Sequence, residues 1–363
     1  MFPKSDRLLG FEALIRWQHP LRGLLLPGMF IALLDRHPLA ITLGDWVIET
    51  ALAQLARWSA QGLHTMVSVN IDALQLLDPD FGDRLQQQLR QQPTVLSSQL
   101  ELEILETGAL ENIAHVSALI ARLQGMGLQC ALDDFGTGYS SLTFLKQLTA
   151  HTLKIDQSFV HGMLDDAEHA TIVNSVLGLA RNFERCALAE GIETEFHGRS
   201  LIEFGCEYGQ GYAIARPMPA ADVPNWLAQW HTPESWASSH PVGPRDIPIL
   251  LAEVELRAWL KQLHACLVLH KPTSPAIDSH ACRFGQWLNR PATRQRFDHH
   301  PYFAHIESIH ESMHRRAEQL LARFHADPSA DVKTELAILD AIGQNILDEL
   351  HQLRRAHLDE GAF

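Results

Sequence analysis

The sequence lacks several features that would assign it to a well-defined class. Its five cysteines stand apart without paired spacing, which argues against a disulfide framework. The N-terminus has neither the basic start nor the apolar stretch of a signal peptide. No apolar run approaches the ~18–20 residues that cross a bilayer. These absences predict a reduced, cytoplasmic protein without membrane insertion.

A surplus of positive charge is also missing. With 29 Lys and Arg against 43 Asp and Glu, the formal net charge is −14, which argues against binding to a nucleic acid polymer. No glycine-rich phosphate fingerprint opens the first strand-helix unit, which argues against a dinucleotide-binding fold. An acidic protein can still bind a phosphate ligand when divalent cations stand between its carboxylates and the phosphates.

The composition predicts two domains. Residues 231–248 are rich in proline, serine and charge and have no apolar period, which is typical of a linker. Strand-like and helical patterns alternate in residues 1–230, whereas the pattern is helical throughout residues 249–358. We therefore expect an α/β domain, a linker and an all-α domain.

Seven short apolar segments separated by amphipathic stretches predict strands in the first domain. They are GFEALIRW, MVSVNI, LELEIL, CALDDF, TLKID, CALAEGI and GQGYAIA. Alternating strands and helices indicate a parallel sheet, and their number favours a (β/α)8 TIM-like barrel over a doubly wound sheet. Since a barrel has eight strands, we expect either that the first strand is absent from this sequence or that another segment closes the seam.

Polar side chains stand in or at the end of these predicted strands. They are Glu12, Asn70, Glu103, Asp133, Asp134, Lys154, Glu190 and Gln210. In a barrel these ends meet at one mouth, where active sites are built. Carboxylate and amide oxygens suit Mg²⁺ or Mn²⁺, and two such ions would neutralise the carboxylates and favour displacement at phosphorus. The residues alone thus predict metal-assisted phosphodiester hydrolysis, with Lys154 orienting the water or a phosphate oxygen.

The segments FEALIRWQHP, SVN, LELE, DDFGTGYSSL, LKID, AEGIET and GCEYGQGY…ARPMP occur in the order and spacing of the EAL domain family. From about residue 9 to 220, the chain closely resembles this family. The resemblance implies hydrolysis of cyclic di-GMP to linear 5'-pGpG with two Mg²⁺ or Mn²⁺ ions, in a homodimer.

The resemblance also implies roles for individual residues. Arg16 would contact a substrate phosphate, Asp134 would lie against the substrate, and Glu106 would anchor the mobile loop DFGTGYSS. The implied metal ligands are Glu12, Asn70, Glu103, Asp133, Asp134 and Glu190, and the implied catalytic residues are Lys154, Glu12, Asp133, Glu190, Gln210 and Glu193.

Two departures from the family pattern keep other functions open. Leu105 stands where the family has a threonine, and the Q-P-I strand that precedes E-A-L in the family is absent. One alternative is a degenerate barrel that binds cyclic di-GMP or docks a partner without cleaving it. Another is a zinc-sensing scaffold that acts through the helical domain. Bound divalent ions at the barrel mouth would favour the enzyme over both.

Histidine is concentrated in the helical part, where 13 of the 21 histidines lie from residue 231 onward. Helical periods there predict a four-helix bundle. The segment HACRFGQWL, followed by HESMH, resembles the chemoreceptor zinc-binding domain, which implies that Cys282, His310 and His314 bind Zn²⁺ and that the domain senses zinc or redox state. The fourth ligand position, three residues before Trp259, holds Leu256.

No residue of the first bundle helix is a clear substitute for that ligand. His264 lies ~12 Å further along the helix at 1.5 Å per residue, too far for a simple exchange. Glu253, one turn earlier, and a water molecule remain candidates.

Overall fold

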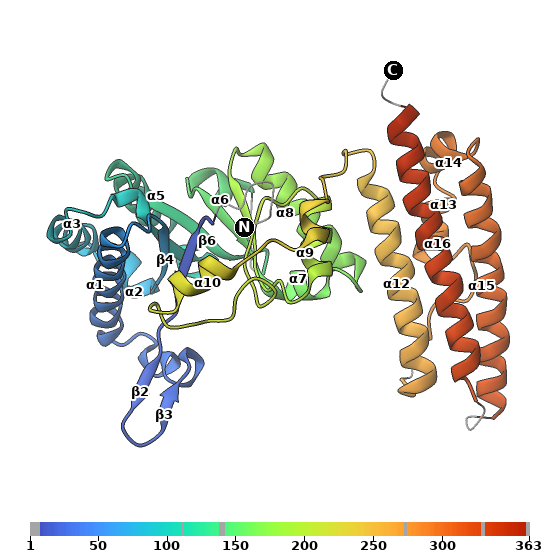
Figure 1. Ribbon diagram of the computed structural model, residues 1–363, viewed down its shortest axis with the longest axis horizontal. Helices are drawn as coiled ribbons and strands as arrows, with labels where there is room; N and C mark the ends of the chain where they lie inside the picture. Colours follow the sequence, from blue (N-terminus) through green and yellow to red (C-terminus); the bar gives the residue numbers. More distant parts are fainter. Residues whose placement is uncertain (1–7, 111, 138–141, 272–273, 328–330, 361–363) are drawn as a thin grey trace. The chain divides into compact units, whose positions relative to one another are not determined.

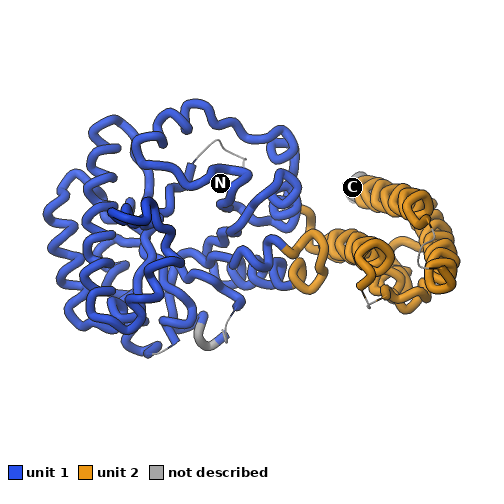
Figure 2. Tube along the Cα trace, turned by 90° about the horizontal axis from the view of Figure 1, so that it is seen from below, with its two compact units in different colours: residues 1–161, 172–241 blue, residues 162–171, 242–363 orange. Residues whose placement is uncertain are grey.

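The computed structural model of the chain describes residues 8–110, 112–137, 142–271, 274–327 and 331–360. The chain forms two compact units (Figure 2). The first comprises residues 1–161 and 172–241, and the second comprises residues 162–171 and 242–363.

A parallel sheet of seven strands forms the centre of the first unit. In spatial order the strands are β1 (Gly10–Ala13), β4 (Met66–Ile71), β5 (Leu100–Leu105), β6 (Gln129–Phe135), β7 (Thr152–Ile155), β8 (Cys186–Ala189) and β9 (Tyr208–Gly209). Every neighbouring pair is parallel, and strand order follows the sequence. This confirms the TIM-like parallel sheet, which has seven strands among the described residues. Within the described ranges, β1 and β9 are the two edges of the sheet.

Helices connect the strands of this unit (Figure 1). They are α1 (Leu39–Ala60), α2 (Ala73–Leu77), α3 (Phe81–Gln91), α4 (Glu106–Leu110), α5 (Ile113–Gly125), α6 (Leu142–Gln147), α7 (Gln157–Gly162), α8 (Ala167–Asn182), α9 (Glu195–Glu203), α10 (Val223–Gln229) and α11 (Glu234–Ala237). A hairpin of β2 (Trp17–His19) and β3 (Gly23–Leu25) follows β1. The sheet supplies the core: Val69, Leu102, Leu132 and Leu153, on four neighbouring strands, are at most 1% exposed.

Helix α1 differs from the expectation that no apolar segment is long enough to cross a membrane. By length and composition alone, it is the one helix among the described residues that meets this criterion. Its Ile48, Leu52 and Leu55 are each buried in the first unit.

The predicted linker, residues 231–248, also differs from expectation, because its first part folds onto the first unit. Helix α11 presents Trp236, which is 1% exposed and donates from Nε1 to the carbonyl of Glu195 at 2.7 Å. Gly198 leaves room for this ring, because a β-carbon there would lie 2.3 Å from the indole. Trp236 and the hydrogen bond from Ser235 Oγ to Glu195 Oε2 at 3.0 Å both attach the segment, and polar composition does not reveal these contacts.

The second unit is helical. Its helices are α12 (Ile247–Val268), α13 (Arg283–Leu288), α14 (Pro291–Phe297), α15 (Pro301–Ala326) and α16 (Lys333–Glu360). Proline in the first turn of α12, α14 and α15 suits each start, since the missing N–H has no partner there anyway. One apolar core joins the long helices, with Leu256, Phe303, Met313 and Leu339 fully buried.

Candidate functional site

The carboxyl ends of the parallel strands bring most of the predicted site residues together. Glu12 lies on β1, Asn70 on β4, Glu103 on β5 and Lys154 on β7. Asp133 and Asp134 lie on β6, while Glu190 and Gln210 directly follow β8 and β9. Side chains from all seven strands of the sheet therefore contribute to one mouth.

A bulge in β6 gives the mouth two consecutive aspartates. Leu132 pairs with Leu153 and Phe135 with Ile155, so two residues of β6 stand opposite the single Lys154 of β7. Asp134 has a left-handed φ of 55°, a conformation in which aspartate is enriched. Alternation along a regular strand would turn one aspartate away from the mouth, and a bulge re-aims it.

Lys154 is the central cation of the mouth. Its side chain is 2% exposed, and its Nζ lies 2.8 Å from Glu103 Oε2, 3.1 Å from Asp133 Oδ1 and 2.7 Å from Glu190 Oε1. Burial alone would lower the pKa of Lys154, but these carboxylates hold it above its ordinary value. The lysine is therefore charged at neutral pH.

Two amides connect the outer carboxylates. Gln210 donates from Nε2 to Glu12 Oε2 at 2.9 Å and to Glu190 Oε1 at 2.9 Å. Asn70 donates from Nδ2 to the other oxygen of Glu12 at 2.8 Å. One oxygen of Glu12 is thus held from the neighbouring strand β4 and the other from the end of β9, the opposite edge of the sheet.

The mouth carries more negative charge than Lys154 can offset. Burial and neighbouring carboxylates raise the pKa of Glu103 to about 8 and that of Glu190 to about 7. The same causes raise the pKa of Asp134 to about 6. Additional positive charge would favour the ionised form of all three groups.

The donor set fits divalent cations. Oxygen atoms of Asp133, Asp134 and Glu190 lie within 4.8 Å of one another, and the nearby donors are carboxylate and amide oxygens. Hard oxygen donors of this kind suit Mg²⁺ or Mn²⁺. The excess of carboxylates over lysine supplies the charge that such ions require.

Glu106 contacts the first part of the predicted loop, residues 134–141. It is 1% exposed, opens α4, and accepts a hydrogen bond from the backbone N–H of Gly136 at 3.2 Å. Gly136 has a φ of 102°, which glycine adopts readily. Residues 138–141 of the loop lie outside the described residues.

Two predicted site residues have no direct contact with the carboxylate cluster among the described hydrogen bonds. Glu193 is exposed and lies 3.5 Å from His161 Nε2. Arg16 donates to the carbonyl of its neighbour Ile15 at 2.9 Å. Their predicted roles rest on the family resemblance alone.

One residue of the mouth was not predicted from the sequence. Asp156 forms a side-chain hydrogen bond with Asp134, and its charge helps raise the pKa of that carboxyl. It also accepts from the backbone N–H of Ser158 at 3.1 Å. Its place at the end of the motif LKID, two residues after Lys154, was a signal that could have identified it.

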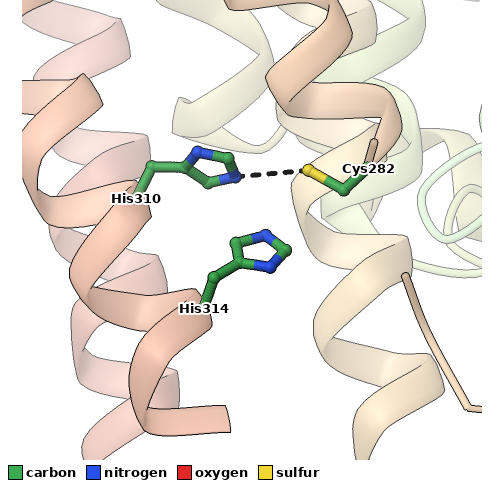
Figure 3. A group of neighbouring side chains, drawn as sticks. All are labelled: Cys282, His310 and His314. Atoms are coloured by element: carbon green, nitrogen blue, oxygen red, sulfur yellow. Dashed lines mark hydrogen bonds between the residues drawn. The ribbon is translucent and has the colours of Figure 1, made fainter. Parts of the chain in front are cut away.

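The second unit contains another cluster, formed by Cys282, His310 and His314 (Figure 3). One ligand atom from each lies within 4.8 Å of the others, and all three side chains are at most 3% exposed. Cys282 Sγ is 3.3 Å from His310 Nε2. Burial lowers the pKa of His310 to about 3, so this ring is neutral and can donate a lone pair. A thiol with two neutral imidazoles fits Zn²⁺.

Comparison with known proteins finds a family match for the α/β part of the chain and another for its helical part. Residues 2–217 match the family model of the EAL domain, and residues 257–321 match that of the chemoreceptor zinc-binding domain. The bifunctional diguanylate cyclase/cyclic di-GMP phosphodiesterase MucR of Pseudomonas aeruginosa is 37% identical over 218 residues, which cover 60% of this chain. The cyclic di-GMP phosphodiesterase PA2567 of the same organism is 36% identical over 229 residues, covering 62%.

The matched regions are only part of these relatives, covering 32% of MucR and 39% of PA2567. Among solved structures, the PaMucR phosphodiesterase in complex with c-di-GMP is 36% identical, with a TM-score of 0.58. That match covers 60% of this chain and 88% of the solved one. The EAL match spans more than half of the chain and includes every strand of the sheet, so the protein belongs to the EAL domain family.

Proposed function

We propose that the first unit hydrolyses cyclic di-GMP to linear 5'-pGpG with Mg²⁺ or Mn²⁺. The observation that carries this proposal is the convergence of five carboxylates around one buried lysine at the mouth of a sheet whose relatives include named cyclic di-GMP phosphodiesterases. Glu12, Asn70, Glu103, Asp133, Asp134 and Glu190 would hold two ions. When bound, such ions acidify water and offset charge on phosphoryl oxygens.

The residues of the mouth have separable roles in this proposal. Lys154 serves as a hydrogen-bond donor and a fixed positive charge among Glu103, Asp133 and Glu190. Gln210 donates hydrogen bonds to both Glu12 and Glu190 and so holds the two carboxylates close to each other. Hydrolysis adds water to one phosphorus, breaks one P–O bond and leaves a 5'-phosphate on the opened dinucleotide, while the freed 3'-oxygen takes a proton.

Turnover of cyclic di-GMP by this chain with Mg²⁺ or Mn²⁺, measured beside Glu12→Ala, tests the proposal. Glu49→Ala is a matched control, because Glu49 is an exposed residue of α1. We expect turnover by the wild type and the control, and its loss in Glu12→Ala. Binding of cyclic di-GMP without turnover by the wild type would favour the alternative of a dinucleotide sensor.

We further propose that the second unit binds Zn²⁺ through Cys282, His310 and His314, and that occupancy of this site changes turnover in a homodimer. Support comes from the three buried donors and the match to a zinc-binding family model. Zinc titrated against the hydrolysis rate tests the regulatory part. A rate that stays constant up to full occupancy would exclude it.

A further inference from the structure

The three donors of the second unit leave one position of a tetrahedral zinc site to be filled. Leu256 faces the core from α12 and is 0% exposed. An aliphatic side chain offers no lone pair, so Leu256 cannot be a ligand. The inference below rests on the proposed zinc site and concerns its fourth ligand.

His314 is arranged to coordinate a cation. Its Nδ1 donates to the carbonyl of Ile277 at 2.6 Å, because a carbonyl can only accept. The proton is thereby held on Nδ1, and Nε2 carries the lone pair. This Nε2 is buried without a hydrogen-bond partner, although the residue is only 3% exposed. A buried acceptor of this kind calls for a positive partner.

The segment that anchors His314 also leads to Cys282. Residues 278–282 form one helical turn, in which the carbonyl of Asp278 accepts from the N–H groups of Ala281 and Cys282, each at 3.1 Å. Asp278 therefore directly follows the residue bonded to His314 and lies one turn before the thiol. It is the acidic residue of this turn.

The Asp278 carboxylate is available for a ligand. One oxygen, Oδ1, accepts from the backbone N–H of His280 at 2.8 Å, and the side chain is 69% exposed. The same Oδ1 lies 3.7 Å from His280 Nδ1.

We propose that Zn²⁺ in the second unit takes its fourth ligand from the Asp278 carboxylate on the turn before Cys282, in place of a side chain from α12. The site is then one thiolate, one carboxylate and two imidazoles. The two negative ligands offset the double charge of the ion, which matters because an uncompensated charge is costly among buried residues.

The acidic residues of α12 are less suitable. Glu253 lies 3.3 Å from His351 Nε2 through its Oε2. Glu255 lies 3.6 Å from Arg283 through its Oε1. Both side chains are thus engaged by an imidazole or a guanidinium, although Glu253 Oε1 is buried without a hydrogen-bond partner among the described residues and Arg283 directly follows Cys282. His280 is the remaining neighbour on the turn, and a separate variant distinguishes it from Asp278.

Zinc affinity of the metal-stripped full chain, measured by competition with a chelator, tests the proposal without any enzymatic readout. Asp278→Asn removes the charge but keeps an oxygen that can accept from His280, so the turn remains. We expect it to weaken zinc binding by at least about 100-fold, more than the change of a residue outside the ligand set. His280→Ala, the matched control, keeps the wild-type affinity.

A second measurement uses Co²⁺ in place of zinc, because its visible bands report the number and type of ligands. We expect Asp278→Asn to change the bands while the thiolate charge-transfer band, absent in Cys282→Ser, remains. Leu256→His supplies a ligand from α12 and should make the affinity insensitive to Asp278→Asn. If Leu256→His fails to fold, Asp278→Asn and Cys282→Ser still decide whether Asp278 is a ligand.

The outcomes separate the two proposals. If zinc binding is unchanged in Asp278→Asn but lost in Cys282→Ser, Asp278 is not the fourth ligand. The proposed site of Cys282, His310 and His314 then still holds. Loss in His280→Ala alone assigns the ligand to His280 and also overturns the inference. No zinc bound by the wild type overturns the zinc site itself, and the inference with it.

Discussion

Gln210 and Glu12 lie 198 residues apart in sequence, yet the Nε2 of Gln210 is 2.9 Å from Oε2 of Glu12. Glu12 belongs to β1 and Gln210 directly follows β9, which are the two edges of the sheet in the described residues. One side-chain hydrogen bond therefore links the two edges of the seven-stranded sheet. The carboxylate that it holds is a proposed metal ligand.

Loss of this link should impair the site more than the fold. We expect Gln210→Ala to lower turnover by about 10–100-fold, as for residues that orient metal ligands. The measurement is the rate at saturating Mn²⁺ together with Mn²⁺ affinity. Gln87→Ala, at an exposed position of α3, is the control and should match the wild type. A normal rate in Gln210→Ala would mean that Glu12 does not need the hydrogen bond from Gln210 for activity.

Lys154 should stabilise the metal-free protein as well as serve catalysis. Lys154→Met leaves Glu103, Asp133 and Glu190 without their cation, and breaking a buried ion pair in this way costs about 3–5 kcal/mol. We expect a lower free energy of unfolding in urea with a chelator present, and loss of turnover. An unchanged unfolding midpoint would contradict the central role given to the lysine.

Divalent ions should stabilise the first unit by relieving repulsion among its carboxylates. We expect Mn²⁺ to raise the thermal midpoint of chelator-treated protein, since a ligand that binds only the folded state stabilises it. Asp134→Asn should reduce this increase, whereas Asp80→Asn, at an exposed position before α3, should not. Equal increases in both variants would place the ion away from Asp134.

Gly211 should be intolerant of a side chain. Its φ is +153°, and a β-carbon would lie 2.2 Å from the backbone nitrogen of Ile192. We expect Gly211→Ala to destabilise the protein by at least about 1–3 kcal/mol, the range for overpacking. Gly125→Ala is the control: it meets open space in α5 and should be neutral or stabilising. Chemical denaturation of the two variants gives the comparison.

The sequence by itself determined which elements form and which residues end the strands. Apolar runs specify strands through local preference, and parallel strands must bring their ends to one edge, so the cluster around Lys154 was predictable from spacing. The seven strands and the helical second part were predictable for the same reason. Asp156 was predictable in principle, because it lies two residues after Lys154 in the motif LKID, which had already identified the lysine.

Only the tertiary structure decided how distant segments meet. The bulge that aims both Asp133 and Asp134 at the mouth depends on the pairing of β6 with β7. Trp236 joins the first unit because Gly198 leaves space for it, although the composition around it is that of a linker. The link between Gln210 and Glu12 depends on the curvature of the whole sheet. Such contacts join residues far apart in sequence, and local patterns carry no information about them.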